Sequence, residues 1–122
     1  MKKILIVEDE KNIVLSLKMF LSNEGFMTES VANGIDAIRI AQEFLPDLIL
    51  LDIILPGMNG YLVCEAIKQN HNTKNIPIVI MSVKNQEEEI RKAYLLGADA
   101  YIIKPFALEE IKSVLDRFLA SV

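Results

Sequence analysis

Polar side chains that could do chemistry recur at the ends of short apolar runs in this sequence. Two acids follow the first run, a third acid closes a later run, and a hydroxyl and an ammonium group follow two more. These residues are Glu8, Asp9, Asp52, Ser82 and Lys104. Carboxylates without a nearby His or Cys favour Mg²⁺ (or Mn²⁺) over zinc. A carboxylate beside such an ion can act as a nucleophile and form an aspartyl phosphate.

The same residues could also neutralise a phosphoryl group during its transfer, which depends mainly on positioning and on compensating charge. Mg²⁺ would supply two positive charges, the Lys104 ammonium another, and the Ser82 hydroxyl a hydrogen bond. Each acid alone has an ordinary structural explanation, as a solvated loop residue or as a negative charge before a helix, like Asp9. The joint placement of all five residues favours one common site.

Apolar runs alternate with segments of helical periodicity along the whole chain. The pattern predicts strands at 4–7, 27–31, 48–52, 77–81 and 100–103, and helices at 11–24, 33–45, 60–69, 86–96 and 107–119. This α/β alternation predicts a parallel sheet with helices on both faces. Segment 27–31 is more polar than the others, which is typical of an edge strand.

The predicted sheet also explains how distant polar residues could meet. In an open parallel sheet, ligands bind beyond the carboxyl ends of the strands, at the point where the strand order reverses. If the order is 2-1-3-4-5, Glu8, Asp9 and Asp52 converge there. The length of 122 residues and the hydrophobic share of 52% suit one domain over residues 1–122.

Charge and composition argue against several classes of protein. The net charge is −4 and no long basic stripe occurs, so we expect no direct nucleic-acid binding. No apolar stretch approaches the roughly 18–20 residues of a membrane span, and we expect a soluble, cytoplasmic protein without membrane contact. The single Cys64 cannot form a disulfide framework. We expect Met19, Met27, Met58 and Met81 to fill the core or a pocket.

Five segments of the chain resemble the receiver domain of two-component response regulators, and together they span nearly its whole length. They read ILIVEDE (4–10), ANGIDA (32–37), PDLILLDIILPGMNG (46–60), PIVIMS (77–82) and GADAYIIKPF (97–106). The resemblance implies a flavodoxin-like (βα)5 three-layer sandwich with sheet order 2-1-3-4-5. It implies a signalling domain rather than an enzyme, which accepts a phosphoryl group from a histidine kinase or phosphotransfer protein.

Roles for the metal ligands follow from the resemblance, position by position. Asp52 would be the phosphoacceptor. Asp9, Asp52 and the backbone carbonyl of Ile54 would bind Mg²⁺ directly, and Glu8 would help through water. Glu8 stands where Asp is commoner in the family, but it keeps an oxygen ligand.

Roles for the phosphoryl contacts and the switch follow in the same way. Ser82 and Lys104 would contact the phosphoryl group, and Lys104–Pro105 would be a cis peptide bond. Tyr101 would be the aromatic residue whose rotamer follows phosphorylation, remodelling the surface of the fourth helix, fifth strand and fifth helix. That surface would bind a downstream protein effector, an attached output domain or a second copy in a phosphorylation-dependent dimer.

Two positions bear on how long the phosphoryl group lasts. Ile54 lies two residues beyond Asp52, and Lys84 lies two residues beyond Ser82. In the family, the side chains at these two positions flank the path of the water that attacks the phosphoryl group. Because an apolar Ile54 cannot orient water, we expect a long-lived phosphoryl group. Ile54 also stands where a phosphatase with an aspartyl-phosphate intermediate needs an acid or base, which argues against that class.

The sequence also bears on two further classes of function. A flavin- or dinucleotide-binding domain would carry a G-x-G-x-x-G loop after the first strand, and this chain has an acidic loop there instead. A receiver-like interaction module that is never phosphorylated is the other alternative, and the presence of all five site residues argues against it.

Overall fold

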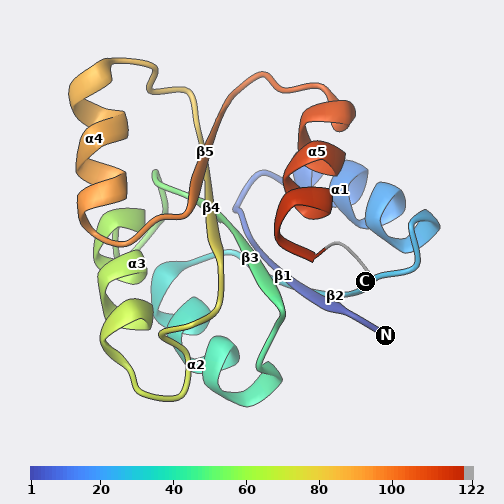
Figure 1. Cartoon of the computed structure of the whole chain (residues 1–122), viewed down its shortest axis with the longest axis horizontal. Helices are drawn as coiled ribbons and strands as arrows, with labels where there is room; N and C mark the ends of the chain where they lie inside the picture. Colours follow the sequence, from blue (N-terminus) through green and yellow to red (C-terminus); the bar gives the residue numbers. More distant parts are fainter. Residues whose placement is uncertain (120–122) are drawn as a thin grey trace.

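The short apolar runs form strands, and each strand leads into a helix (Figure 1). The computed structural model describes residues 1–119. The strands are β1 (Lys3–Val7), β2 (Met27–Val31), β3 (Leu48–Asp52), β4 (Ile78–Ser82) and β5 (Ala100–Ile103). The helices are α1 (Lys11–Asn23), α2 (Gly34–Phe44), α3 (Gly60–Gln69), α4 (Glu87–Leu95) and α5 (Leu108–Leu119).

The five strands form one parallel sheet in the order β2-β1-β3-β4-β5. This order confirms the predicted flavodoxin-like fold and places the polar β2 at an edge. Strand order reverses between β1 and β3, where Val7 pairs with Leu51. The residues that follow these two partners are therefore neighbours at the carboxyl edge of the sheet.

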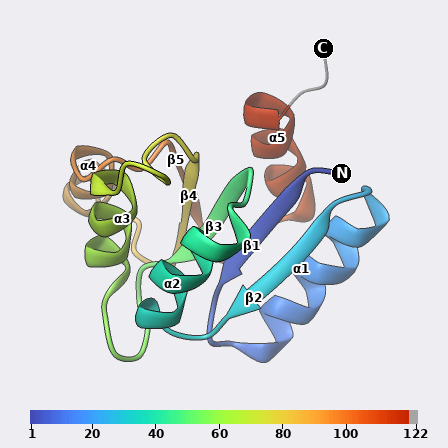
Figure 2. The same cartoon turned by 90° about the horizontal axis from the view of Figure 1, so that it is seen from below.

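Alternate strand residues point to opposite faces of the sheet, so the core has two layers. On one face, residues such as Leu5 and Ile49 pack against α2, α3 and α4. On the other face, residues such as Ile4 and Leu48 pack against α1 and α5. Figure 2 shows α1 and α5 on one side of the sheet and the other three helices across it. The result is the expected three-layer sandwich.

The start of α3 lies directly against the end of β3. The Gly60 amide donates to the Ile53 carbonyl at 2.6 Å. A Cβ atom at Gly60 would lie 2.4 Å from the Ile53 Cα and 2.5 Å from the Asp52 carbonyl oxygen. Only glycine allows this approach without moving the backbone. Gly60 therefore helps to fix the path of the chain immediately after Asp52.

Predicted and observed boundaries differ by at most one residue. For example, β4 begins at Ile78 rather than Pro77. The expectation that methionines fill the core or a pocket is confirmed for Met81, which is buried, and for Met58, which packs against the core. It is wrong for Met19 and Met27, because both are exposed. Met27 lies on the edge strand β2, and Met19 lies on α1 away from the buried Leu17 and Leu21. Within residues 1–119, no helix combines the length and the apolar character that a membrane crossing needs.

Candidate functional site

Three carboxylates meet where β1 and β3 end. Glu8 and Asp9 follow β1, Asp52 is the last residue of β3, and one oxygen atom of each lies within 4.8 Å of the others. Glu8 and Asp52 are buried, whereas Asp9 is exposed. The cluster is therefore open to solvent on the side of Asp9, as a site for an entering ion or phosphoryl donor must be.

Lys104 lies between the two buried acids. Its Nζ is 2.6 Å from Glu8 Oε1 and 3.0 Å from Asp52 Oδ2, and its side chain is 10% exposed. The remaining carboxylate oxygens accept from loop amides: Glu8 Oε2 from Glu10 N at 3.1 Å and Asp52 Oδ1 from Ile54 N at 3.1 Å. Both acids are thus oriented by the backbone that follows their strands.

Burial and charge act in opposite directions on these groups. Burial raises the pKa of Glu8, and the hydrogen bond from Lys104 only partly opposes it. Burial alone would lower the pKa of Lys104, but the hydrogen bonds to Glu8 and Asp52 outweigh it and raise that pKa. Lys104 therefore stays protonated, and one ammonium group faces three carboxyl groups. The site retains excess negative charge for a further cation.

Ser82 and Lys104 lie side by side at the same edge. Ser82 ends β4 and is fully buried, and the Lys104 amide donates to its carbonyl at 2.7 Å. The Ser82 hydroxyl oxygen accepts from the Lys84 amide at 3.1 Å. The Lys104–Pro105 peptide bond directly beyond β5 is cis.

Tyr101 and Ile54 flank this arrangement. The Tyr101 ring, on β5, is half-buried, and its hydroxyl donates to the Lys84 carbonyl at 2.7 Å. Ile54 lies in the loop after β3, and 53% of it is exposed. The structure thus places the three acids, Ser82, Lys104 and Ile54 at the carboxyl edge of the sheet. Tyr101 lies within β5, and its hydroxyl contacts the loop after β4.

Comparison with known proteins agrees with this geometry. The family profile described as the response regulator receiver domain matches residues 4–116, nearly the whole chain. The chain belongs to the response regulator receiver domain family. Receiver domains are phosphoacceptor signalling modules of two-component systems rather than catalytic enzymes, and their partner is a histidine kinase.

This receiver domain is similar in sequence to curated response regulators. The chain is 37% identical over 109 residues to the phosphate regulon transcriptional regulatory protein PhoB of Rhizobium meliloti, covering 89% of this chain and 48% of that protein. It therefore spans about half the length of the curated relatives it matches.

Two crystal structures are also similar to this receiver domain. A two-component response regulator from Clostridium difficile is 34% identical, with a TM-score of 0.91 and coverage of 98% of this chain and 96% of that one. The receiver domain of the sensor histidine kinase PA1611 from Pseudomonas aeruginosa, solved with magnesium coordinated in its active-site cleft, is 29% identical. Its TM-score is 0.90, and 98% of each chain is covered.

Sequence reasoning missed one polar group of this receiver domain that lies next to the predicted switch. The Tyr61 hydroxyl, on α3, contacts Glu89 in the first turn of α4. The two residues are 28 positions apart, and neither belongs to a motif. The only sequence indication is that a tyrosine on a buried helix face needs a partner for its hydroxyl.

Proposed function

We propose that Asp52 accepts a phosphoryl group from a histidine kinase or phosphotransfer protein in the presence of Mg²⁺. The supporting observation is the convergence of Glu8, Asp9 and Asp52 within 4.8 Å, with Lys104 as the one ammonium group that pairs with them among the described residues. In this proposal residues 1–122 act as one receiver domain.

The donor set suits the proposed ion. Asp9, Asp52 and the Ile54 backbone carbonyl would bind Mg²⁺ (or Mn²⁺), and Glu8 would help through water. Only oxygen ligands are present, which favours these hard ions over zinc. The magnesium in the cleft of the PA1611 receiver domain supports this choice. The bound ion would neutralise charge on the phosphoryl oxygens.

The transfer step uses groups already oriented at the site. A carboxylate oxygen of Asp52 attacks the phosphorus of a phosphohistidine, the P–N bond breaks, and its electron pair stays with the imidazole, which takes up a proton from solvent. Lys104 and the Ser82 hydroxyl would then contact the phosphoryl oxygens. The Ile54 amide, which donates to Asp52 Oδ1, holds the carboxylate in place.

The structural change caused by phosphorylation would begin in the loop after β4. Phosphorylation adds about −1.5 to −2 charges at Asp52, and Ser82 carries the one side-chain hydroxyl of β4. Movement of Ser82 carries Lys84, whose amide binds Ser82 and whose carbonyl binds Tyr101. The surface formed by α4, β5 and α5 changes in response.

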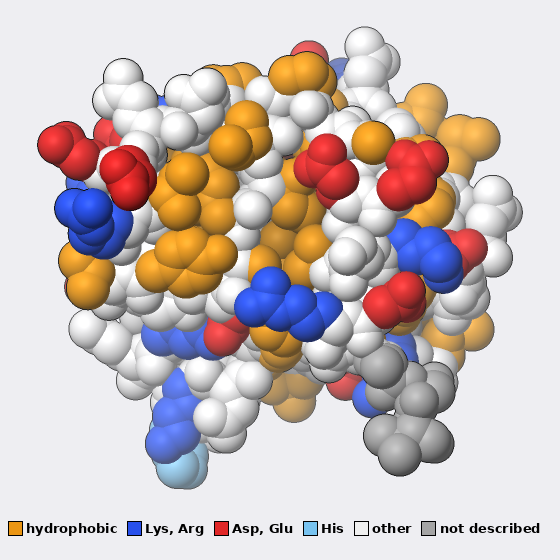
Figure 3. Space-filling view, turned by 45° about the horizontal axis from the view of Figure 1, so that its top comes forward, with side chains coloured by type: hydrophobic (Ala, Val, Ile, Leu, Met, Phe, Trp, Pro, Cys, Tyr) orange, Lys and Arg blue, Asp and Glu red, His pale blue; other side chains and the backbone are white. Residues whose placement is uncertain are grey.

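That surface has the chemistry of a docking site for a protein. Leu95 on α4 is 79% exposed, and Ile103 on β5 is also exposed. Figure 3 shows hydrophobic side chains gathered on the face between α4 and α5. The occupant would be a downstream effector, an attached output domain or a second copy of the chain.

Intact mass spectrometry after incubation with acetyl phosphate and Mg²⁺ tests the central step. We expect the wild type to gain one phosphoryl group and Asp52→Asn to gain none. Asp116→Asn, which removes an exposed acid outside the site, is the matched control and should label like the wild type. Labelling of Asp52→Asn at the wild-type level would refute the assignment.

The lifetime of the phosphoryl group is a second test. Ile54 offers no polar atom on its side chain to orient water, so we expect the isolated phosphoprotein to keep its label well beyond minutes. Ile54→Gln, which supplies an amide at this exposed position, should shorten the lifetime. Loss of the wild-type label within minutes would contradict the expectation.

The role of Tyr101 is tested separately from labelling. Tyr101→Ala removes the hydrogen bond to the Lys84 carbonyl but none of the acids. We expect normal phosphorylation with weakened binding of the partner, measured by titration of the phosphorylated protein. Unchanged partner binding would show that Tyr101 does not transmit the switch.

A further inference from the structure

A buried phenol joins α3 to the first turn of α4. Tyr61, which is 7% exposed and part of the core, donates its hydroxyl to the Glu89 carboxylate and approaches the Glu89 carbonyl at 3.3 Å. The Lys92 ammonium lies 4.4 Å from the centre of the Tyr61 ring, one helical turn further along α4. One residue of α3 therefore holds two residues of α4, and we refer to the Tyr61–Glu89 contact as the latch.

The protonation states of the two groups favour this contact. Burial, and after it the Glu89 carboxylate, raises the pKa of Tyr61, so the hydroxyl remains a donor. The hydrogen bond from Tyr61 lowers the pKa of Glu89, so the carboxylate stays ionised. A hydrogen bond to an ionised acceptor is about twice as strong as one between neutral groups.

The latch is connected to the proposed phosphorylation site on two sides. On the side of α3, Tyr61 follows Gly60, whose amide binds the Ile53 carbonyl directly after Asp52. On the side of the loop, Glu89 lies 3.8 Å from the Lys84 ammonium, and the Lys84 amide donates to Ser82. A movement of the Ser82 loop therefore acts on Glu89 while α3 stays fixed to the end of β3.

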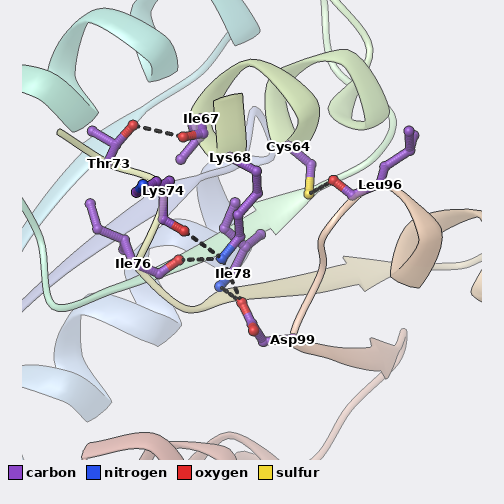
Figure 4. Close-up of polar contacts among 9 residues, drawn as sticks. All are labelled: Cys64, Ile67, Lys68, Thr73, Lys74, Ile76, Ile78, Leu96 and Asp99. Carbon is purple, nitrogen blue, oxygen red and sulfur yellow. Dashed lines mark hydrogen bonds and ion pairs between the residues drawn. The ribbon is translucent and has the colours of Figure 1, made fainter. Parts of the chain in front are cut away.

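The other end of α4 is held by separate contacts (Figure 4). The Cys64 thiol on α3 contacts the Leu96 carbonyl at 3.6 Å. Lys68 pairs with Asp99 at 2.9 Å, and Asp99 accepts from the Ile78 amide at the start of β4. These contacts lie at the far edge of the sheet from Asp52. Displacement of α4 would thus be concentrated at its first turn, where the latch is.

We propose that Tyr61 is a positioning residue that restrains the first turn of α4 in its unphosphorylated arrangement, and that phosphorylation of Asp52 works against this restraint. Only the statement about phosphorylation rests on the proposed function; the restraint by Tyr61 does not. Because the intact latch stabilises the unphosphorylated arrangement, removing it should favour the switched state.

Tyr61→Phe removes the hydroxyl and keeps the buried ring and its contact with Lys92. Without the phosphoryl group, we expect the Ile90 amide, which donates to Gln86 in the first turn of α4, to exchange its hydrogen about tenfold faster. Amides of β3 should keep their wild-type rates. Tyr94→Phe, the same change at an exposed tyrosine of α4 whose hydroxyl makes no hydrogen bond among the described residues, is the matched control and should leave all rates unchanged.

The second measurement is the concentration of beryllofluoride, a phosphoryl analogue, that half-saturates the protein in Mg²⁺. We expect Tyr61→Phe to lower it about threefold to tenfold relative to wild type and Tyr94→Phe. Normal Ile90 exchange, equal acceleration of β3 amides, or an unchanged or higher half-saturating concentration would each overturn the proposal. If the wild type binds no analogue at Asp52, the proposed function fails instead, and the exchange rates alone decide whether Tyr61 positions α4.

Discussion

A lysine pairs with a carboxylate at the carboxyl ends of the strands, and another does so at their amino ends, but the two lysines have different surroundings. At the carboxyl edge, Lys104 binds Glu8 and Asp52 with Asp9 nearby, so acids outnumber the ammonium group. At the amino edge, Lys68 binds one acid, Asp99, and donates to the Ile76 and Lys74 carbonyls at 2.8 and 3.4 Å.

The difference separates a structural cluster from a reactive one. The Lys68 cluster is complete, because Asp99 has the Ile78 amide as its second donor and the lysine has three acceptors. It joins α3, the loop before β4 and the start of β5. The Lys104 cluster has more negative than positive charge, and a divalent cation or a phosphoryl group with its ion can complete it. Excess charge in a partly buried place is the feature on which the proposed phosphorylation site rests.

The largest effect is expected from Lys104→Met. Removal of the ammonium leaves two buried carboxylates unpaired, and we expect the free energy of unfolding to fall by about 3 kcal/mol without Mg²⁺. Mg²⁺ at ten times its Kd should restore about 1.4 kcal/mol, because it binds only the folded site. Urea unfolding with and without Mg²⁺ measures both values. Equal stability of variant and wild type without Mg²⁺ would show that the acids do not need Lys104.

Lys68→Met is expected to have a smaller effect that Mg²⁺ does not reverse. The lysine is more exposed than Lys104, and Asp99 keeps the Ile78 amide, so we expect a loss of about 2 kcal/mol. The same urea series measures it. Recovery of this variant by Mg²⁺ beyond that of the wild type would mean that the amino edge also has an unfilled charge.

The smallest effects should have opposite signs at the two edges. Asp52→Asn removes one of three neighbouring acids, so without Mg²⁺ we expect stability to rise by about 1 kcal/mol. Asp99→Asn removes the only acid paired with Lys68 among the described residues, so we expect a loss of about 1 kcal/mol, limited by the partial exposure of Asp99. Thermal unfolding of both variants compares them, and a loss of stability in both would remove the distinction between the edges.

Local patterns were sufficient to predict the elements and their order. The apolar runs and the segments of helical periodicity predicted boundaries to within one residue, because both patterns are local properties of the chain. The edge position of β2 followed from its polar residues. The exposure of Met19 and Met27 was not predicted, because a flexible apolar side chain gives no indication of which helix or strand face it occupies.

By itself, the sequence determined which residues could form the site: three acids, a hydroxyl and a lysine, each at the end of a predicted strand. Only the tertiary structure decided how they pair. Lys104 binds Glu8 more closely than Asp52, although 96 positions separate Lys104 from Glu8. Tyr61 on α3 contacts Glu89 on α4. The physical reason is that strand and helix patterns arise between near neighbours in the chain. A hydrogen bond between distant side chains depends on where the packed layers place them.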